Sequence, residues 1–169
     1  LAYNSAEQEY LVVWQATNSL EEGSDEYEIF GQRLTSEGTP IGADDFRISD
    51  MGPDGDADWD AFKPSVAHNT VSNEYLVVWL GSLSVYGQRL DAAGNEIGAD
   101  DSVINQTSVF TGTVAIAYSA ANNEYLVAWE SLNVAFDVFV RRLDADGIPI
   151  DPAELQISDM GGGTAGRLD

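Results

Sequence analysis

Five aspartates within one short segment are the strongest candidate for chemistry in this sequence. They lie between residues 50 and 60 and alternate with small residues, namely Asp50, Asp54, Asp56, Asp58 and Asp60. Carboxylates held this close repel one another unless a cation neutralises them. Ca²⁺ takes about six to eight oxygen ligands and suits flexible loops that contain glycine. The segment therefore predicts a calcium site, with a solvated acidic loop as the alternative.

This segment does not match an EF-hand loop. Counted from Asp54, the sixth position, which should be glycine, is Trp59. Ser65 stands where an EF-hand has its bidentate glutamate. Any calcium site here must therefore be of another kind.

Trp59 is the second candidate, because it lies among the aspartates and outside the repeated pattern described below. An exposed indole ring offers a flat apolar face on which a sugar ring can stack. The functional hypothesis is a carbohydrate-binding residue. The alternative is that Trp59 packs over the aspartate segment.

Other residues that could do chemistry favour structural roles. Cysteine is absent, so thiol catalysis is excluded, and the single histidine, His68, occupies a position held by tyrosine in the other repeats. A residue that replaces a repeated aromatic predicts packing rather than catalysis. Paired carboxylates can hydrolyse glycosides, but among so many acids no pair stands out.

Three arginines recur one place before a repeated leucine, at Arg33, Arg89 and Arg142. One interpretation is a repeated ligand contact. The other is a scaffold role, in which each guanidinium bonds a neighbouring carboxylate or carbonyl. The second is favoured, because the same residue in every repeat fits a scaffold better than a single site.

The charge of the chain excludes some partners. Twenty-nine acidic residues against seven basic ones give a formal net charge of −22. Nucleic acids and anionic membranes both need Lys and Arg to neutralise phosphate, so neither is an expected partner. No apolar run approaches the ~18 residues of a membrane span. The acidity suits solubility in an extracellular setting, and a start at Leu1 suggests a processed chain or a fragment.

The elements that must position these residues come from a threefold repeat. The pattern Glu-Tyr-Leu-Val-Val-Trp occurs at 9–14 and 74–79, and recurs at 124–129 with alanine for the second valine. The offsets between the copies divide the chain into repeats 1–60, 61–110 and 111–169.

Each repeat contains four short apolar segments separated by turn residues. In the second repeat they are 65–69, 75–79, 85–90 and a segment around 102–104. The segment 75–79 is rich in β-branched and aromatic residues and apolar on both faces, which predicts an inner strand covered on both sides. No long 3.6-residue apolar period occurs, so almost no helix is expected.

The connections between these segments differ in a regular way. The first and third have constant lengths, and Gly38, Gly94 and Gly147 mark the third. The second varies, with 20, 11 and 14 residues from the repeated tryptophan to the repeated leucine, and the fourth varies too. In a four-stranded meander both variable connections lie at the same end of the sheet. Variable loops on a constant scaffold are where binding usually resides.

Four antiparallel strands at a period of about 50 residues match one blade of a β-propeller. We therefore predict an all-β chain of three four-stranded antiparallel blades. Propellers typically close with about four to eight blades. The ring would then be partial, or completed by a longer parent chain or by oligomerisation. A β-sandwich or an open solenoid is the alternative fold.

The repeat also resembles a known group of proteins. The pattern Glu-Tyr-Leu-Val-Val-Trp, then 31–34 (Gly-Gln-Arg-Leu), 41–42 (Ile-Gly) and 46–49 (Phe-Arg-Ile-Ser), resembles repeats of large bacterial secreted or surface β-propeller proteins. The aspartate segment loosely resembles the calcium loops of integrin-type propeller blades. The resemblance implies a propeller fold and an extracellular or cell-surface location, and it implies no particular activity.

Together these observations predict a non-catalytic extracellular or cell-surface β-propeller module that binds or supports other molecules and is stabilised by calcium. Its expected partners are further blades, further copies of itself, a glycan or a surface protein. A lectin-like carbohydrate-binding module and the scaffold of a glycan-active hydrolase are the alternatives.

Overall fold

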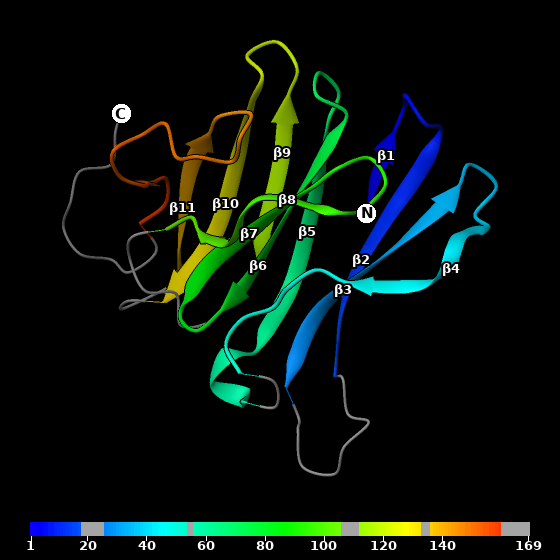
Figure 1. Ribbon diagram of the computed structural model, residues 1–169. Coiled ribbons are helices and arrows are strands. Elements are labelled where there is room, and N and C mark those ends of the chain that lie inside the picture. The colour runs from blue at the N-terminus through cyan, green and yellow to red at the C-terminus, as the bar shows by residue number, and fades with distance from the viewer. Residues whose placement is uncertain (18–25, 54–55, 106–111, 133–135, 160–169) are drawn as a thin grey trace.

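The computed structural model describes residues 1–17, 26–53, 56–105, 112–132 and 136–159. Within these residues the chain forms three four-stranded antiparallel sheets and one short 3₁₀ helix, η1 (Ala57–Trp59). The all-β prediction is confirmed. The sheets stand side by side as an open fan and do not close into a ring (Figure 1). No helix in this part of the chain is long and apolar enough to cross a membrane.

Each sheet is a meander in chain order and lies within one predicted repeat. Sheet 1 contains β1 (Ala2–Asn4), β2 (Glu9–Thr17), β3 (Tyr27–Thr35) and β4 (Pro40–Arg47). Sheet 2 contains β5 (Ala61–Asn69), β6 (Glu74–Gly81), β7 (Ser84–Leu90) and β8 (Glu96–Val103). Sheet 3 contains β9 (Val114–Ser119), β10 (Glu124–Leu132), β11 (Phe136–Leu143) and β12 (Leu155–Gln156).

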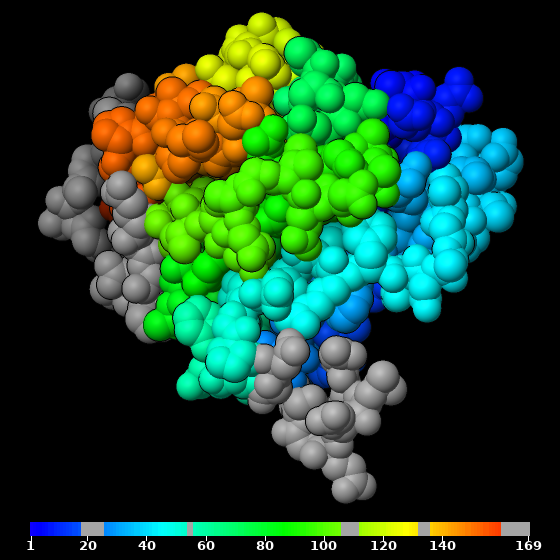
Figure 2. Space-filling model, in the orientation of Figure 1, coloured from blue at the N-terminus to red at the C-terminus, as the bar shows by residue number. Residues whose placement is uncertain are grey.

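Two hydrophobic cores hold the three sheets together, one on each face of sheet 2. Figure 2 shows sheet 2 in green between sheet 1 in blue to cyan and sheet 3 in yellow to orange. Successive side chains of a strand point to opposite faces, so β6 contributes alternately to the two cores. Tyr75, Val77 and Trp79 pack against sheet 1. Leu76, Val78 and Leu80 pack against sheet 3. This explains why the repeated segment is apolar on both faces.

The constant connections lie at one end of the sheets and carry repeated side-chain bonds. The Asn4 Oδ1 atom accepts hydrogen bonds from the N–H groups of Ala6 and Glu7, and Asn69 holds the next turn in the same way. The Asn4 Nδ2 group donates across to the Asn73 Oδ1 atom of sheet 2 at 2.8 Å. Asn69 makes the same link to Asn123 of sheet 3 at 3.4 Å. These amides both form the turns and join neighbouring sheets.

The three repeated arginines act in the scaffold. Each contacts the glutamate that opens the second strand of its own sheet, in the pairs Arg33–Glu9, Arg89–Glu74 and Arg142–Glu124. Arg33 and Arg89 also reach the next sheet, at the Ala93 carbonyl and Asp146, whereas Arg142 bonds Asp151 in its own β11–β12 connection. Glycines in the left-handed region, with φ of +82°, +90° and +77°, close the turns at Gly38, Gly94 and Gly147. The scaffold interpretation of the arginines is the one that these contacts favour.

The fourth segment of each repeat is placed differently from our expectation. The strands β4 and β8 end at Arg47 and Val103, so the repeated Ile48 and Ile104 follow the strands instead of lying within them. Their N–H groups still bond the carbonyls of Ile29 and Val85, at 2.7 and 2.8 Å. In sheet 3 the fourth strand shrinks to Leu155–Gln156. Pro152 lies just before it, and proline cannot donate a ladder hydrogen bond.

Candidate functional site

Two of the variable connections, β4–β5 and β6–β7, lie together at the end of the sheets opposite the asparagine turns (Figure 1). The β4–β5 connection carries the aspartates and turns through η1, and Asp56 caps this short helix by accepting a hydrogen bond from the Asp58 N–H at 3.1 Å. The β6–β7 connection touches it, because the Ser82 hydroxyl donates to the Asp58 carbonyl at 2.7 Å. Two loops of sheet 2 therefore brace one another at this end.

Asp50, Asp56 and Asp60 of the predicted metal site each have a local partner for their carboxylate. Asp60 Oδ1 accepts a hydrogen bond from the Tyr27 N–H at 2.7 Å, which ties the β4–β5 connection to β3. Asp50 lies near Arg47, at 3.2 Å, and its own N–H donates to Asp101. Asp54 lies outside the described residues. Capping and loop bracing therefore account for Asp56 and Asp60 without a metal.

The described carboxylates do not converge on a metal position. In the part of the chain that the structure describes, no three acidic or histidine side chains group closely enough to hold a metal ion. Ca²⁺ needs several oxygens around one point, and the described aspartates are spread along the connection. As placed, they do not form a calcium site, and the calcium prediction stays a prediction.

Trp59 packs against the loop that carries it. A Cβ atom added at Gly52 would lie 2.3 Å from Cγ of the Trp59 ring, so the indole rests directly on the glycine backbone. Gly52 has a φ of +73°, a conformation that glycine adopts without strain. Trp59 is 38% exposed. Of the two interpretations of Trp59, this contact favours packing over the aspartate segment.

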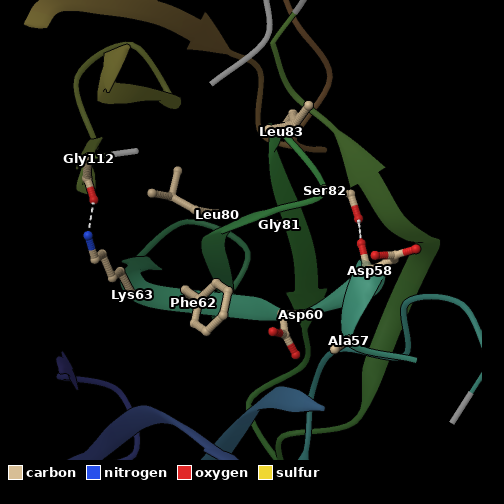
Figure 3. Close-up of a pocket in the computed structure, with 10 residues that line it drawn as sticks. All are labelled: Ala57, Asp58, Asp60, Phe62, Lys63, Leu80, Gly81, Ser82, Leu83 and Gly112. Carbon is tan, nitrogen blue, oxygen red and sulfur yellow. Dashed lines mark hydrogen bonds between the residues drawn. The ribbon is translucent and has the colours of Figure 1, made fainter. Parts of the chain in front are cut away.

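A pocket of about 450 Å³ opens beside the aspartates, between the ends of sheets 2 and 3. Its lining combines carboxylates, apolar side chains and loop backbone: Ala57, Asp58, Asp60, Phe62, Lys63, Leu80, Gly81, Ser82, Leu83 and Gly112. Figure 3 shows Phe62 and Leu80 between the two sides of the lining, with Lys63 bonded to Gly112 on one side and Ser82 bonded to Asp58 on the other. Two of the predicted aspartates, Asp58 and Asp60, thus lie at a cavity, whereas Trp59 does not line it.

A bulge in β5 creates the wall of this pocket. The register between β5 and β6 shifts between Phe62 and Ser65, and Lys63 has a φ of +53°. The Lys63 N–H donates to the Gln15 side chain of sheet 1 at 2.8 Å, and its Nζ donates to the Gly112 carbonyl at 2.5 Å. Bulges redirect side chains at the ends of strands. Here the bulge fixes Lys63 between sheets 1 and 3.

The floor of the pocket is accessible because the neighbouring turn is short. Sheet 2 has the shortest connection from the repeated tryptophan to the repeated leucine, 11 residues against 20 and 14. Its turn residues Ser82 and Leu83 both have positive φ, +40° and +65°, as in a two-residue hairpin of type I′. A turn this tight leaves the partly buried Phe62 accessible at the pocket, whereas Leu80 is only 8% exposed and belongs to the core.

A second group of polar residues joins sheets 1 and 2 away from the pocket. Glu28 is 1% exposed and accepts hydrogen bonds from Ser49 and Arg47. Burial raises the pKa of Glu28 to about 7, although Ser49 and Arg47 oppose this rise. Burial likewise raises the pKa of Asp101 to about 6, opposed by the Asp50 N–H and reinforced by neighbouring acids. These carboxylates bind protons more tightly in the folded state.

We expect Asp101→Asn to stabilise the protein at neutral pH. A carboxyl whose pKa is raised from 3.8 to about 6 contributes stability below pH 3.8 that is lost as pH rises through 6. Asp101 Oδ1 is also buried without a hydrogen-bond partner among the described residues. After discounting for its solvent contact, we expect a gain of about 1 kcal/mol at pH 7.5 and a smaller one at pH 5. Thermal unfolding at both pH values tests this, and an equal gain at both would contradict the titration.

Sequence reasoning did not identify the pocket residues Phe62, Lys63 and Leu83. Two signals were present: Pro64, which interrupts the ladder of β5, and the short β6–β7 connection. His68, in contrast, has the structural role that the sequence predicted, since its ring lies 5.1 Å from the ring of Tyr75 and Nε2 lies 3.1 Å from Asn73 Oδ1.

Comparison with known proteins adds no assignment to this geometry. No protein-family model matches the chain, and no curated protein matches it either. The functional interpretation therefore rests on the chain's own residues.

Proposed function

We propose that this chain is a non-catalytic β-propeller module of the extracellular space or cell surface, which binds a ligand at the end of the sheets that carries the variable loops. The arrangement of the strands supports a propeller: β5 contacts both β1 and β9, so the first strands of the three sheets lie side by side. The other strands fan outward in chain order. The strongly negative charge suits this location and disfavours nucleic acid as a partner.

The observation that carries the proposal is the position of the pocket. Asparagine turns, arginine pairs and turn glycines repeat at the opposite end and serve the scaffold. The pocket lies among the connections that vary between repeats, and it exists where the connection is shortest. Binding sites concentrate in such loops because the scaffold tolerates their variation.

A carbohydrate is the ligand class that the lining favours. Asp58 and Asp60 offer acceptors for hydroxyl groups, and the partly buried Phe62 and the exposed Leu83 offer an apolar surface for the face of a sugar ring. The two carboxylates disfavour an anion. In this proposal Phe62 takes the stacking role that the sequence suggested for Trp59. The scaffold of a glycan-active hydrolase gains no supporting observation from the described residues.

Titration calorimetry with a panel of neutral oligosaccharides tests the pocket. We expect one sugar class to bind at one site per chain, and Asp58→Asn or Phe62→Ala to weaken binding about tenfold or more, because a hydrogen bond to a charged group contributes about 1.5–3 kcal/mol. Asp58→Asn leaves the Asp56 cap on the Asp58 N–H in place. Trp59→Phe, outside the pocket, is the matched control and should bind normally. Loss of binding in Trp59→Phe alone would place the sugar elsewhere.

Calcium is proposed as a stabiliser, and it is tested separately. We expect calcium to raise the melting temperature relative to excess chelator, because a ligand bound only by the folded state stabilises it by about 2.7 kcal/mol at 100 times its Kd. The double variant Asp56→Asn/Asp58→Asn should lose this rise. Asparagine still caps helices well, so the η1 cap survives the change.

The control for the calcium experiment is Asp44→Asn/Asp45→Asn, which removes two adjacent exposed carboxylates on β4. It should keep the full response to calcium. A melting temperature that calcium leaves unchanged would reject the metal site and assign the aspartates to capping and solubility.

A further inference from the structure

Among the described residues, sheet 1 and sheet 3 each have one face that no other sheet covers, and the two faces differ. On β2, the side chains of Tyr10, Val12 and Trp14 point away from sheet 2, and each is only partly buried. We call this the leading face. The counterparts of these three residues, Tyr75, Val77 and Trp79 in sheet 2, are fully buried against sheet 1. The same residue types are therefore core in one sheet and surface in another.

Sheet 3 leaves the opposite side of the repeat open. On β10 and after β12, Leu126 and Ile157 are 45% and 58% exposed. Their counterparts in sheet 2, Leu76 and Ile104, are each 2% exposed in the core shared with sheet 3. With Ala128 and Val138, they form what we call the trailing face. Such large exposed apolar residues in register mark an interaction surface.

The internal interfaces show what each open face fits. The leading face of sheet 2 packs on the trailing side of sheet 1, and the leading face of sheet 3 packs on the trailing side of sheet 2. The chain thus forms the same type of contact twice. The leading face of sheet 1 and the trailing face of sheet 3 are the two halves of a third such contact.

Charges at the rim point the same way. In the internal interfaces an arginine reaches the tip of the next sheet's third turn: Arg33 Nη1 donates to the Ala93 carbonyl at 3.2 Å, and Arg89 Nη1 lies 3.0 Å from Asp146. Arg142 has the equivalent position on the trailing face. Its Nε and Nη2 atoms donate to Asp151 at 3.1 and 2.7 Å, and its side chain is still 49% exposed, against about 20% for the other two arginines. Glu37, exposed at the tip of the β3–β4 turn, has the position of Asp146.

We propose that the trailing face of sheet 3 docks on the leading face of sheet 1 in a second copy of this chain, with Arg142 paired to Glu37 of that copy. Two copies joined by two such contacts close a ring of six sheets, within the roughly four to eight blades of known propellers. This inference rests on the propeller arrangement proposed above and is independent of the ligand in the pocket. Its test measures mass, so the two proposals can fail separately.

The contact between copies is weaker than the internal ones. The amide link from Asn4 to Asn73, repeated from Asn69 to Asn123, needs asparagine at both positions. On the trailing face the donor position holds Ser119, and on the leading face the acceptor position holds Gln8. Association is therefore reversible, and the double variant Ser119→Asn/Gln8→Asn should tighten it.

Sedimentation equilibrium of the 169-residue chain over a range of concentrations tests the proposal. We expect a monomer–dimer equilibrium that reaches twice the 18.2 kDa chain mass. Added salt should strengthen it, because salt screens the general repulsion between two chains of charge −22. Leu126→Asp places a charge in the trailing face and should abolish the dimer. Val71→Asp, at an exposed turn of the central sheet 2, is the matched control and should dimerise normally.

Charge reversal identifies the partner face. Arg142→Glu and Glu37→Arg should each weaken the dimer about tenfold, because like charges then meet at both contacts. The double variant Arg142→Glu/Glu37→Arg restores opposite charges and should recover the dimer. Circular dichroism checks that each variant is folded. A chain that stays monomeric at high concentration, or a dimer that Leu126→Asp and the single reversals leave intact, would overturn the proposal.

Discussion

Replacing Trp79 with alanine should lower the free energy of unfolding by about 3–5 kcal/mol, the usual cost of removing a large aromatic side chain from a core. Trp79 is fully buried between sheets 1 and 2, its ring stacks on Tyr86 with centroids 6.3 Å apart, and its Nε1 lies 3.2 Å from the Met51 sulfur. Domains are stable by only about 5–15 kcal/mol, so this loss is a large fraction of the total. Urea unfolding followed by circular dichroism measures it.

Trp14→Ala is the matched control for this change. Trp14 has the same position in sheet 1, but its side chain lies on the open leading face and is only partly buried. In chain diluted until it is monomeric, its removal should cost about 1 kcal/mol or less, since the loss scales with the apolar area withdrawn from water. Equal losses at the two positions would mean that the leading face is covered within a single chain.

Asn4→Ala should destabilise the fold by about 2–3 kcal/mol. The Asn4 side chain is fully buried, holds two turn N–H groups and links sheet 1 to Asn73 of sheet 2. Alanine leaves these groups without partners, and a buried polar group left unpaired costs about 1–3 kcal/mol. Chemical unfolding again gives the value.

Two further variants separate the roles of Asn4. Asn4→Asp keeps the oxygen that accepts the turn N–H groups and removes the donor to Asn73, so its loss should be intermediate. Ser119→Ala changes the exposed equivalent in sheet 3 and should stay within about 0.5 kcal/mol. A loss in Ser119→Ala as large as that in Asn4→Ala would show that the turn itself, and not the link between sheets, carries the effect.

Local signals in the sequence were enough to predict the first three strands of each repeat and the turns. Continuous apolar runs rich in β-branched and aromatic residues define β2, β6 and β10, and turn glycines at fixed offsets define the third connection in each repeat. These signals work because strand periodicity and turn chemistry depend on a few neighbouring residues. The structural role of His68 followed from the same comparison between repeats.

The structural role of the aspartate segment could not be predicted from its own residues. Its composition suggested a metal site, yet Asp56 caps a helix of three residues and Asp60 holds a strand of sheet 1. Phe62, Lys63 and Leu83 form a pocket because a bulge in β5, a tight turn after β6 and the chain before β9 meet at one place. The pocket forms where these three separate segments meet, and the residue pattern of any one segment does not predict it.

The sequence by itself determined the number and order of the strands, because the repeat encodes each four-stranded sheet in its own residues. Only the tertiary structure decided which copies of that repeat are buried. Tyr10, Val12 and Trp14 match Tyr75, Val77 and Trp79 residue for residue, and only the second set lies in a core. Burial is a property of the neighbouring sheet as much as of the strand, and that neighbour is supplied by packing over long distances in the chain.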